Sequence, residues 1–118
     1  MTIMTTHEVA NANGFTSEKH EETIQELNTL LSSHQTYYQN LRGLHWNIIG
    51  KSFFSLHEKF EELYDEAAND IDEIAERILT LGGRPLHSFA EYVEHSTLKP
   101  VTDVSDPEKA VDVVLENS

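Results

Sequence analysis

Several residue types are scarce or absent in this 118-residue sequence, which has no cysteine, three prolines, five glycines and one tryptophan. The absence of cysteine excludes disulfides, thiolate metal sites and cysteine nucleophiles. No apolar run approaches the roughly 20 residues of a membrane span, and the first residues lack the basic-then-apolar pattern of a signal peptide. We therefore expect a soluble, cytoplasmic protein with no membrane partner.

Basic residues are also scarce, since 8 Lys and Arg stand against 21 Asp and Glu, a formal net charge of −13. Proteins that bind nucleic acid or anionic membranes neutralise phosphates with a basic face, so we expect no DNA binding by this chain. Hydrophobic residues make up 38% of the sequence, which disfavours wholesale disorder. The length allows one domain with a modest core.

The apolar pattern predicts a long first helix over residues 17–48, after a flexible tail at residues 1–16. Apolar residues and two histidines recur there with a 3-4-3-4-3-4-3 spacing, which is a helical stripe of seven-residue period. The stripe consists of Ile24, Leu27, Leu31, His34, Tyr38, Leu41, His45 and Ile48.

A second long helix is predicted from Ser55 to about residue 81. Ser55 and Glu58 fit a capping box, and the Gly82-Gly83-Arg84-Pro85 sequence predicts the helix end. Its apolar stripe consists of Phe53, Leu56, Phe60, Leu63, Ala67, Ile71, Ile74, Ile78 and Leu81. Because the link between the two helices is short, we expect an antiparallel helix hairpin.

Two further helix starts follow the hairpin. Ser88 and Glu91 form a capping box that opens a short helix to about His95, and Asp106-Pro107 opens a helix that runs to the last residues. Two long amphipathic helices cannot bury both apolar faces against each other. We therefore expect a partial domain over residues 17–118, completed by further helices of a longer bundle or by other chains.

Histidines and carboxylates are the abundant polar residues. The sequence has seven histidines, and nine carboxylates lie between Glu58 and Glu76 with a single Lys59 among them. Histidine nitrogen and carboxylate oxygen together suit iron, zinc or manganese. A solvated acidic helix face is the alternative interpretation of the same carboxylates.

The spacing of these residues indicates a site that one chain cannot close. A hairpin that turns near Gly50 brings His45 and His57 face to face, and Asp72 and Glu76 share one face of the second helix. His57 and Asp72, however, are separated by roughly 22 Å of helix. A two-fold dimer with antiparallel helices would bring the histidines of one chain to the carboxylates of the other. The chain also lacks the Glu-x-x-His pair of intrachain di-iron bundles.

The motifs resemble those of the Dps proteins, the DNA-protection-during-starvation branch of the ferritin-like superfamily, over residues 17–118. They are the stretch from Leu44-His45-Trp46 to His57-Glu58, the Asp72-Glu73-Ile74-Ala75-Glu76-Arg77 segment and Leu81-Gly82-Gly83. The resemblance implies an all-α, ferritin-like fold and a twelve-subunit shell. It also implies a ferroxidase that oxidises Fe²⁺, preferentially with hydrogen peroxide, stores ferric iron and protects against oxidative stress.

The resemblance assigns site residues one by one. His45 and His57 would bind iron from one subunit, and Asp72 and Glu76 would complete the site from its two-fold partner. The fifth ligand of the family, usually Asp, falls on Glu61. Zinc or another divalent metal could substitute for iron.

Two departures from the family pattern are visible. Family members continue through two full helices after the loop, whereas this chain ends inside the first of them, so we expect a truncated chain. The N-terminal region carries only Lys19 as a basic residue. The alternatives are a non-catalytic acidic helical interaction protein and a DNA-compacting Dps without efficient ferroxidase activity.

The remaining aromatic and histidine residues receive simpler predictions. Trp46 either packs at the hairpin turn or, as the resemblance implies, is an oxidisable side chain beside the iron. We expect core or interface positions for Tyr37, Tyr38 and Tyr64, core positions for His34, Phe53, Phe54 and Phe60, and surface positions for His7, His20, His87 and His95.

Overall fold

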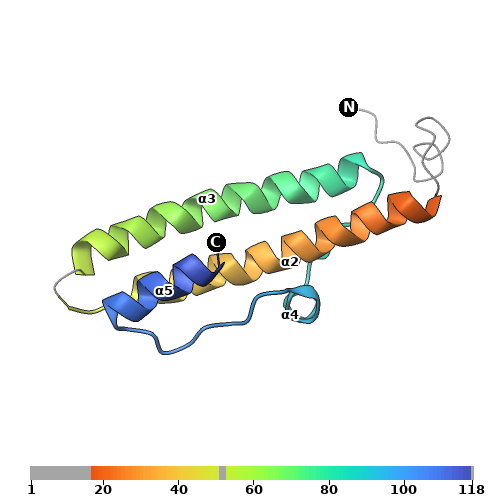
Figure 1. Cartoon of the computed structure of the whole chain (residues 1–118). Coiled ribbons are helices and arrows are strands. Elements are labelled where there is room, and N and C mark those ends of the chain that lie inside the picture. The colour runs from red at the N-terminus through yellow and green to blue at the C-terminus, as the bar shows by residue number, and fades with distance from the viewer. Residues whose placement is uncertain (1–16, 51–52, 118) are drawn as a thin grey trace.

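The computed structural model describes residues 17–50 and 53–117, except for the side chain of Phe53, and every element in these ranges is a helix (Figure 1). The helices are α2 (Ser17–Asn47), α3 (Phe53–Thr80), α4 (Phe89–His95) and α5 (Pro107–Asn117). The predicted tail at residues 1–16 and the predicted core position of Phe53 lie outside this description. The all-α prediction is confirmed.

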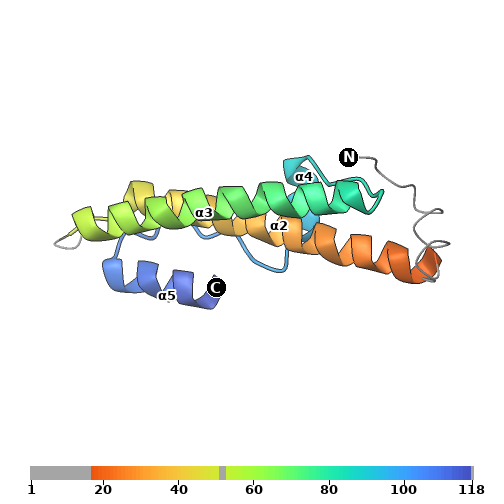
Figure 2. The same ribbon diagram turned by 90° about the horizontal axis from the view of Figure 1, so that it is seen from above.

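Helices α2 and α3 form the predicted antiparallel hairpin and lie side by side along their length (Figures 1 and 2). Their facing stripes, joined by Ala110 of the last helix, supply two hydrophobic clusters. One cluster, near the turn, contains Leu41, Leu44, Ile48, Phe60, Ala67 and Ala110, and the other, toward the far end, contains Ile24, Leu31 and Ile78. Each fully buried Leu, Ile or Phe contributes roughly 1.5–3 kcal/mol, so these clusters hold the two helices together.

The start of α3 differs from the prediction. The helix begins at Phe53, so Ser55 lies in its first turn and the prediction that Ser55 caps the helix is wrong. A serine is tolerated there because the first four N–H groups of a helix have no intrahelical partner. This helix start places His57 in the second turn of α3.

The predicted end of α3 at the glycine pair is confirmed. Gly82 has a φ of 80°, and its N–H donates to the carbonyl of Leu79 while the N–H of Gly83 donates to that of Ile78. This pair of bonds is the Schellman arrangement, which satisfies carbonyls that the helix itself leaves unpaired. A Cβ on Gly83 would lie 2.8 Å from Cγ2 of Ile24, so only glycine allows α2 and α3 to approach so closely at this end.

A polar stripe of α2 binds the long connection that leads from α3 past α4 to α5. Asn40, which is 4% exposed, donates from Nδ2 to the carbonyl of Lys99 and accepts the N–H of Val101. Equivalent bonds join Asn28 to Arg84 and Leu86, Ser33 to Thr97, and Thr36 to Ser96. Hydrogen bonds from α2 therefore fix the path of this connection.

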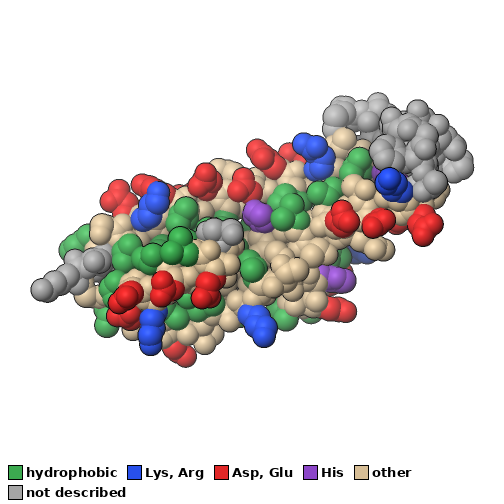
Figure 3. Space-filling model, in the orientation of Figure 1, with side chains coloured by type: hydrophobic (Ala, Val, Ile, Leu, Met, Phe, Trp, Pro, Cys, Tyr) green, Lys and Arg blue, Asp and Glu red, His purple; other side chains and the backbone are tan. Residues whose placement is uncertain are grey.

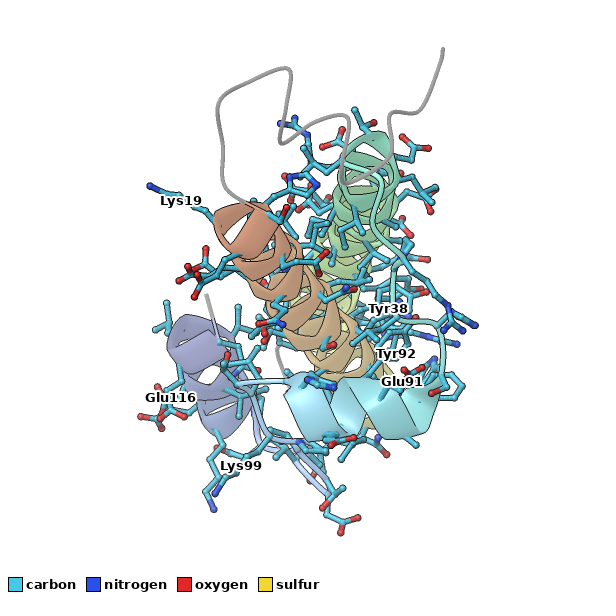
Figure 4. All side chains as sticks on the ribbon, turned by 90° about the vertical axis from the view of Figure 1, so that its right-hand side faces the viewer. Lys19, Tyr38, Glu91, Tyr92, Lys99 and Glu116 are labelled. Atoms are coloured by element: carbon cyan, nitrogen blue, oxygen red, sulfur yellow. The ribbon has the colours of Figure 1, made fainter. Side chains whose placement is uncertain are left out.

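Both short helices start where their caps predicted. The hydroxyl of Ser88 accepts the N–H of Glu91, and a side-chain oxygen of Asp106 accepts the N–H of Lys109. Helix α5 lies along the turn half of α2 (Figure 1) and buries Ala110 completely in the turn cluster. Helix α4 lies against α2 on the same side as Tyr38 (Figure 4).

Large apolar side chains remain exposed in this chain. Phe60 is buried as predicted, but Phe54 is 82% exposed, so the prediction of a core position for Phe54 is wrong. Phe54 falls outside the stripe of α3, and the helix turns it away from α2. Hydrophobic side chains gather at the end where α5 lies, while acidic side chains follow α3 (Figure 3). Among the described helices, none combines the length and the apolar character of a membrane span.

Candidate metal centre

His45 and His57 form a reciprocal pair at the turn of the hairpin. Their rings stack with centroids 3.5 Å apart and an interplanar angle of 17°. Nδ1 of His45 lies 2.5 Å from the carbonyl oxygen of His57, and Nδ1 of His57 lies 2.6 Å from the carbonyl oxygen of His45. A carbonyl oxygen can only accept, so each Nδ1 carries the proton and donates.

These two bonds determine which nitrogen of each ring can bind a metal. A neutral imidazole protonated at Nδ1 has its lone pair on Nε2, and a bond from Nδ1–H to a carbonyl fixes both the tautomer and the ring orientation. His45 is 7% exposed and His57 is half-buried, so the pair is largely removed from solvent. Imidazole nitrogens of this kind suit a metal such as iron or zinc.

Local structure explains why the pair forms. His45 lies in the last turn of α2, where the carbonyls have no intrahelical partner, and the ring of His57 supplies one. The N–H of Ile49 donates to the carbonyl of Ser105, which anchors the start of the link to the segment before α5. The short link then returns the chain directly to α3.

Tyr64 and Glu61 extend the pair along α3. The ring of Tyr64 meets the ring of His45 edge-on, with centroids 5.3 Å apart and an angle of 84°. The Tyr64 hydroxyl donates to Oε1 of Glu61 over 3.5 Å, which is a long hydrogen bond. Burial, and then the negative charge of Glu61, raise the pKa of Tyr64 above its ordinary value of 10.0.

The structure does not bring Asp72 and Glu76 to the histidines. Both side chains are exposed, as is that of Glu61, and they lie farther along the same helix. Within residues 17–50 and 53–117, no three His, Asp or Glu side chains lie close enough together to hold a metal ion. One chain therefore presents the two histidines and the two carboxylates as separate groups.

All nine carboxylates between Glu58 and Glu76 are exposed. The ion pair described among them joins Lys59 to Glu62 over 3.5 Å at the surface. A surface pair of this kind contributes little stability, roughly 0–1 kcal/mol. The acidic side chains of α3 thus face solvent in a single chain.

The other histidines correct part of the sequence analysis. The prediction that His20 is solvated is wrong, because His20 is 4% exposed and its Nε2–H donates to the carbonyl of Leu81 over 2.7 Å. Its position four residues before Ile24 extends the apolar stripe by one step, a signal that could have shown its burial. His34 is half-buried rather than fully in the core, and its Nδ1 lies 3.3 Å from the carbonyl of Leu30. His87 and His95 are exposed, as predicted.

Trp46 does not pack into the hairpin turn, so that prediction is wrong for the isolated chain. It is 57% exposed, and the guanidinium of Arg42 lies 4.7 Å from the centroid of its ring. The same guanidinium lies 5.3 Å from the ring of Tyr38. The indole is a neighbour of His45 in sequence but points to the surface, because the residue after a buried position lies about 100° around a helix.

A cavity of about 240 Å³ adjoins this aromatic group, between α2 and α4. Its lining includes Tyr38 and Arg42 of α2 and Phe89, Tyr92 and Val93 of α4. Figure 4 shows Tyr38 and Tyr92 on the same side of the molecule. The cavity contains none of the candidate metal ligands.

Comparisons with known proteins give one consistent result. The Ferritin family, described as a ferritin-like domain, matches residues 24–118. A DNA protection during starvation protein of Porphyromonas gingivalis is 45% identical over 108 residues, covering 80% of this chain and 68% of that protein. An uncharacterized protein of Haemophilus influenzae is 43% identical over 95 residues, covering 80% of this chain and 59% of that protein.

Solved structures give the same result at the level of the fold. The crystal structure of a Dps protein from Vibrio cholerae, described as a member of a superfamily of ferritin-like diiron-carboxylate proteins, superposes with a TM-score of 0.80 at 44% identity. It covers 84% of this chain, and the chain covers 63% of it. Antigen TpF1 from Treponema pallidum has a TM-score of 0.83 at 28% identity, with 86% of this chain and 66% of that one covered.

The chain thus spans 59% to 68% of the length of these relatives. Within that span, the all-helical fold and the family match agree with one another. The chain belongs to the Dps family of the ferritin-like superfamily, as its motifs predicted.

Proposed function

We propose that this chain is a subunit of an iron-oxidising and iron-storing protein, a ferroxidase whose substrate is Fe²⁺. The observation that carries the proposal is the reciprocal His45–His57 pair, in which both Nδ1–H groups bond to carbonyls and both Nε2 lone pairs can bind a metal. Membership of a ferritin-like family supports iron as that metal.

The site would be completed by a second copy of the chain. Asp72 lies fifteen positions after His57 on one straight helix, roughly 22 Å along its axis, so the two side chains of one chain cannot share an ion. A two-fold axis that sets two hairpins antiparallel would bring His45 and His57 of one copy to Asp72 and Glu76 of the other, and would form two equal sites. In the assembled protein we expect the twelve-subunit shell that the resemblance implies.

Each ligand would have its own role. His45 and His57 would bind Fe²⁺ as neutral nitrogen donors, while Asp72 and Glu76 would neutralise the added charge of Fe³⁺. Carboxylates are hard, anionic ligands and stabilise Fe³⁺ more than Fe²⁺, so the donor set favours oxidation. Glu61, next to Tyr64, would place a second ion. Hydrogen peroxide would accept one electron from each of two Fe²⁺ ions, take up two protons and leave as water.

The exposed acidic side chains would serve supply and storage. A chain with a net charge of −13 attracts cations, and this field would concentrate Fe²⁺ near α3. Carboxylates that line the inner face of a shell would bind Fe³⁺ and start the mineral. Removal of Fe²⁺ and peroxide together would protect the cell against oxidative stress.

The test is the double variant His45→Ala with Asp72→Ala, measured by the rate of peroxide-driven Fe²⁺ oxidation. We expect rapid oxidation to be abolished, because one ligand is removed from each half of the site. Asp70→Ala is the matched control, since Asp70 is an exposed carboxylate on the same helix outside the proposed ligand set. An unchanged rate in the double variant would refute the assignment.

Two alternatives make different predictions. A non-catalytic acidic interaction protein would show no ordered metal, so a crystal soaked with Zn²⁺ and measured at the zinc edge distinguishes it from the proposed site. A solved structure of Dps from Listeria innocua was soaked with zinc, which shows that the experiment is practical. Anomalous density between His45, His57 and a partner's Asp72 would support the proposal.

DNA compaction is the second alternative, and the charge of the chain disfavours it. With 8 basic residues against 21 acidic ones, the chain repels a duplex over a Debye length of about 8–10 Å. We expect no retardation of DNA in a gel-shift titration with EDTA at about 150 mM salt. Retardation at micromolar protein would contradict this expectation.

A further inference from the structure

Tyr64 joins two parts of the candidate site that come from different helices. It lies one helical turn after Glu61 on α3, and the two residues are joined by the 3.5 Å bond from the Tyr64 hydroxyl to Oε1 of Glu61. The edge of its ring meets the His45 imidazole of α2 at 5.3 Å between centroids.

We propose that Tyr64 is a positioning residue, which orients the His45 ring through its own ring and holds the Glu61 carboxylate through its hydroxyl. The proposal rests on the proposed function, in which both groups bind metal. His45 already has one face covered by the stacked ring of His57. The perpendicular contact with Tyr64 limits the rotation of the imidazole ring about the bond that joins it to Cβ.

The surroundings of Tyr64 hold the ring in this position. Tyr38 meets it edge-on from α2, with centroids 5.8 Å apart and an angle of 89°. Tyr38 is itself covered by the guanidinium of Arg42 at 5.3 Å. Tyr64 also packs against the turn cluster, so its ring is the fixed part of the arrangement and Glu61 is the adjustable part.

This arrangement explains how a glutamate can occupy a position where the resemblance expects aspartate. Glu61 is exposed, and its extra methylene gives it more rotamers to lose when it binds an ion. The Tyr64 hydroxyl, which has a fixed position, reduces the number of rotamers that Glu61 occupies before an ion binds. Hydrogen bonds of this kind are often long in the unliganded protein and shorten when the ligand binds, which fits the 3.5 Å distance.

The test is a double-mutant cycle on the affinity for Co²⁺. Calorimetry and the visible absorption of the bound ion measure that affinity. The variants are Tyr64→Phe, Glu61→Ala and the two together in the full chain. We expect Tyr64→Phe to weaken the Glu61-dependent binding step roughly tenfold, the lower end of what such supporting residues contribute. In the Glu61→Ala background the same change should have no further effect. Tyr37→Phe, another half-buried tyrosine beside the turn cluster, is the matched control and should change nothing.

Three outcomes separate the two proposals. If Tyr64→Phe binds Co²⁺ with the same affinity as the unsubstituted chain, the role of the hydroxyl is overturned and the proposed function is unaffected. Equal losses with and without Glu61 indicate a general structural effect and overturn it too. Failure of the unsubstituted chain to bind Co²⁺ overturns the proposed function itself.

The role of the ring is tested without any metal. In protein treated with a chelator, the NMR shifts of the His45 ring protons should change by several tenths of a ppm in Tyr64→Leu, because the ring current is lost, and stay close to the original values in Tyr64→Phe. Unchanged His45 shifts in a folded Tyr64→Leu variant would overturn this half of the proposal. If Tyr64→Leu does not fold, two other variants replace it. The role of the Tyr64 ring would then be overturned if the His45 ring protons kept their shifts in Tyr38→Leu and changed them in Tyr64→Phe.

Discussion

The two ends of the hairpin use histidine in the same way and for different purposes. At the free end, where α2 begins and α3 stops, His20 donates from Nε2 to the carbonyl of Leu81. At the turn end, His45 and His57 donate from Nδ1 to each other's carbonyls. In each case a ring nitrogen donates to a carbonyl on the other arm of the hairpin and joins the two arms.

The difference lies in which nitrogen the bond uses. A histidine bonded through Nδ1 directs its Nε2 lone pair away from the backbone, where a metal can reach it. His20 instead uses Nε2, the nitrogen that remains available in His45, and this leaves only Nδ1 for any other partner. His57 also has a carboxylate one turn later, Glu61, whereas the position one turn after His20 is the buried Ile24. Burial and hydrogen bonding alone therefore do not distinguish a candidate ligand from a structural histidine.

The largest expected effect is a loss of metal affinity when a histidine at the turn end is replaced. Replacing His45 by alanine should weaken Zn²⁺ binding by at least roughly a hundredfold, since loss of a supporting residue alone costs about 10–100-fold. His20→Ala should leave the affinity unchanged. Isothermal titration with Zn²⁺ measures both, and comparable losses in the two variants would contradict the distinction drawn here.

Gly83→Ala should give the next largest effect, at the free end. The new Cβ would lie 2.8 Å from Cγ2 of Ile24 and 3.0 Å from Cγ2 of Ile78, so the helices must separate. We expect a loss of about 1–3 kcal/mol in the free energy of unfolding. Gly43→Ala is the control, because nothing lies within 4 Å of the position that its Cβ would take. We expect this change to raise the free energy of unfolding by about 0.5–1 kcal/mol, since alanine favours a helix more than glycine does. Urea denaturation of both variants compares them directly.

His20→Ala should destabilise the chain less than Gly83→Ala. It leaves the Leu81 carbonyl without its donor, which costs about 1–2 kcal/mol when water can partly replace the lost bond. His20→Gln keeps an N–H donor on a side chain of similar length and should recover part of the loss. Thermal unfolding with and without Zn²⁺ is the measurement, and an effect of His20 on the zinc-induced shift would show that the free end also binds metal.

The smallest effect concerns acid stability near the free end. The hydrogen bond from the Ser88 hydroxyl holds the pKa of Glu91 below its ordinary value of 4.5. A carboxyl with a lowered pKa in the folded state adds stability above its unfolded pKa, and this stability is lost as the pH falls through the folded pKa. We therefore expect Ser88→Ala to reduce the melting temperature slightly at pH 7, and this difference should shrink to the pH-independent loss of the Ser88 cap as the pH falls through the lowered pKa of Glu91. A difference that grows as the pH falls would have the wrong sign.

Much of the fold follows from short-range patterns in the sequence. The seven-residue stripe gave the bounds of α2 to within one residue, and the glycine pair gave the end of α3. The caps at Ser88 and Asp106 gave the starts of the short helices. These features depend on neighbours within about one helical turn, which is why they can be predicted.

Other features depended on contacts that are distant in sequence. The polar stripe of α2 is made by side chains such as Asn40, whose hydrogen-bond partners lie about sixty residues later in the sequence. The residues next to Asn40 in the sequence do not indicate these partners. Phe54 reads as a core residue by its type alone, yet its direction is set by where α3 begins. The hydrogen bond of His20 also depends on a distant group, the carbonyl of Leu81 just past the end of α3.

The sequence by itself determined the helices, their antiparallel pairing and the set of candidate ligands, His45, His57, Glu61, Asp72 and Glu76. Only the tertiary structure decided which nitrogen each histidine uses and that Tyr64 stands between His45 and Glu61. The physical reason is one of range. Periodicity and capping act along the chain within a turn or two, whereas a tautomer and a ring orientation are set by whichever group the fold places across the gap between α2 and α3.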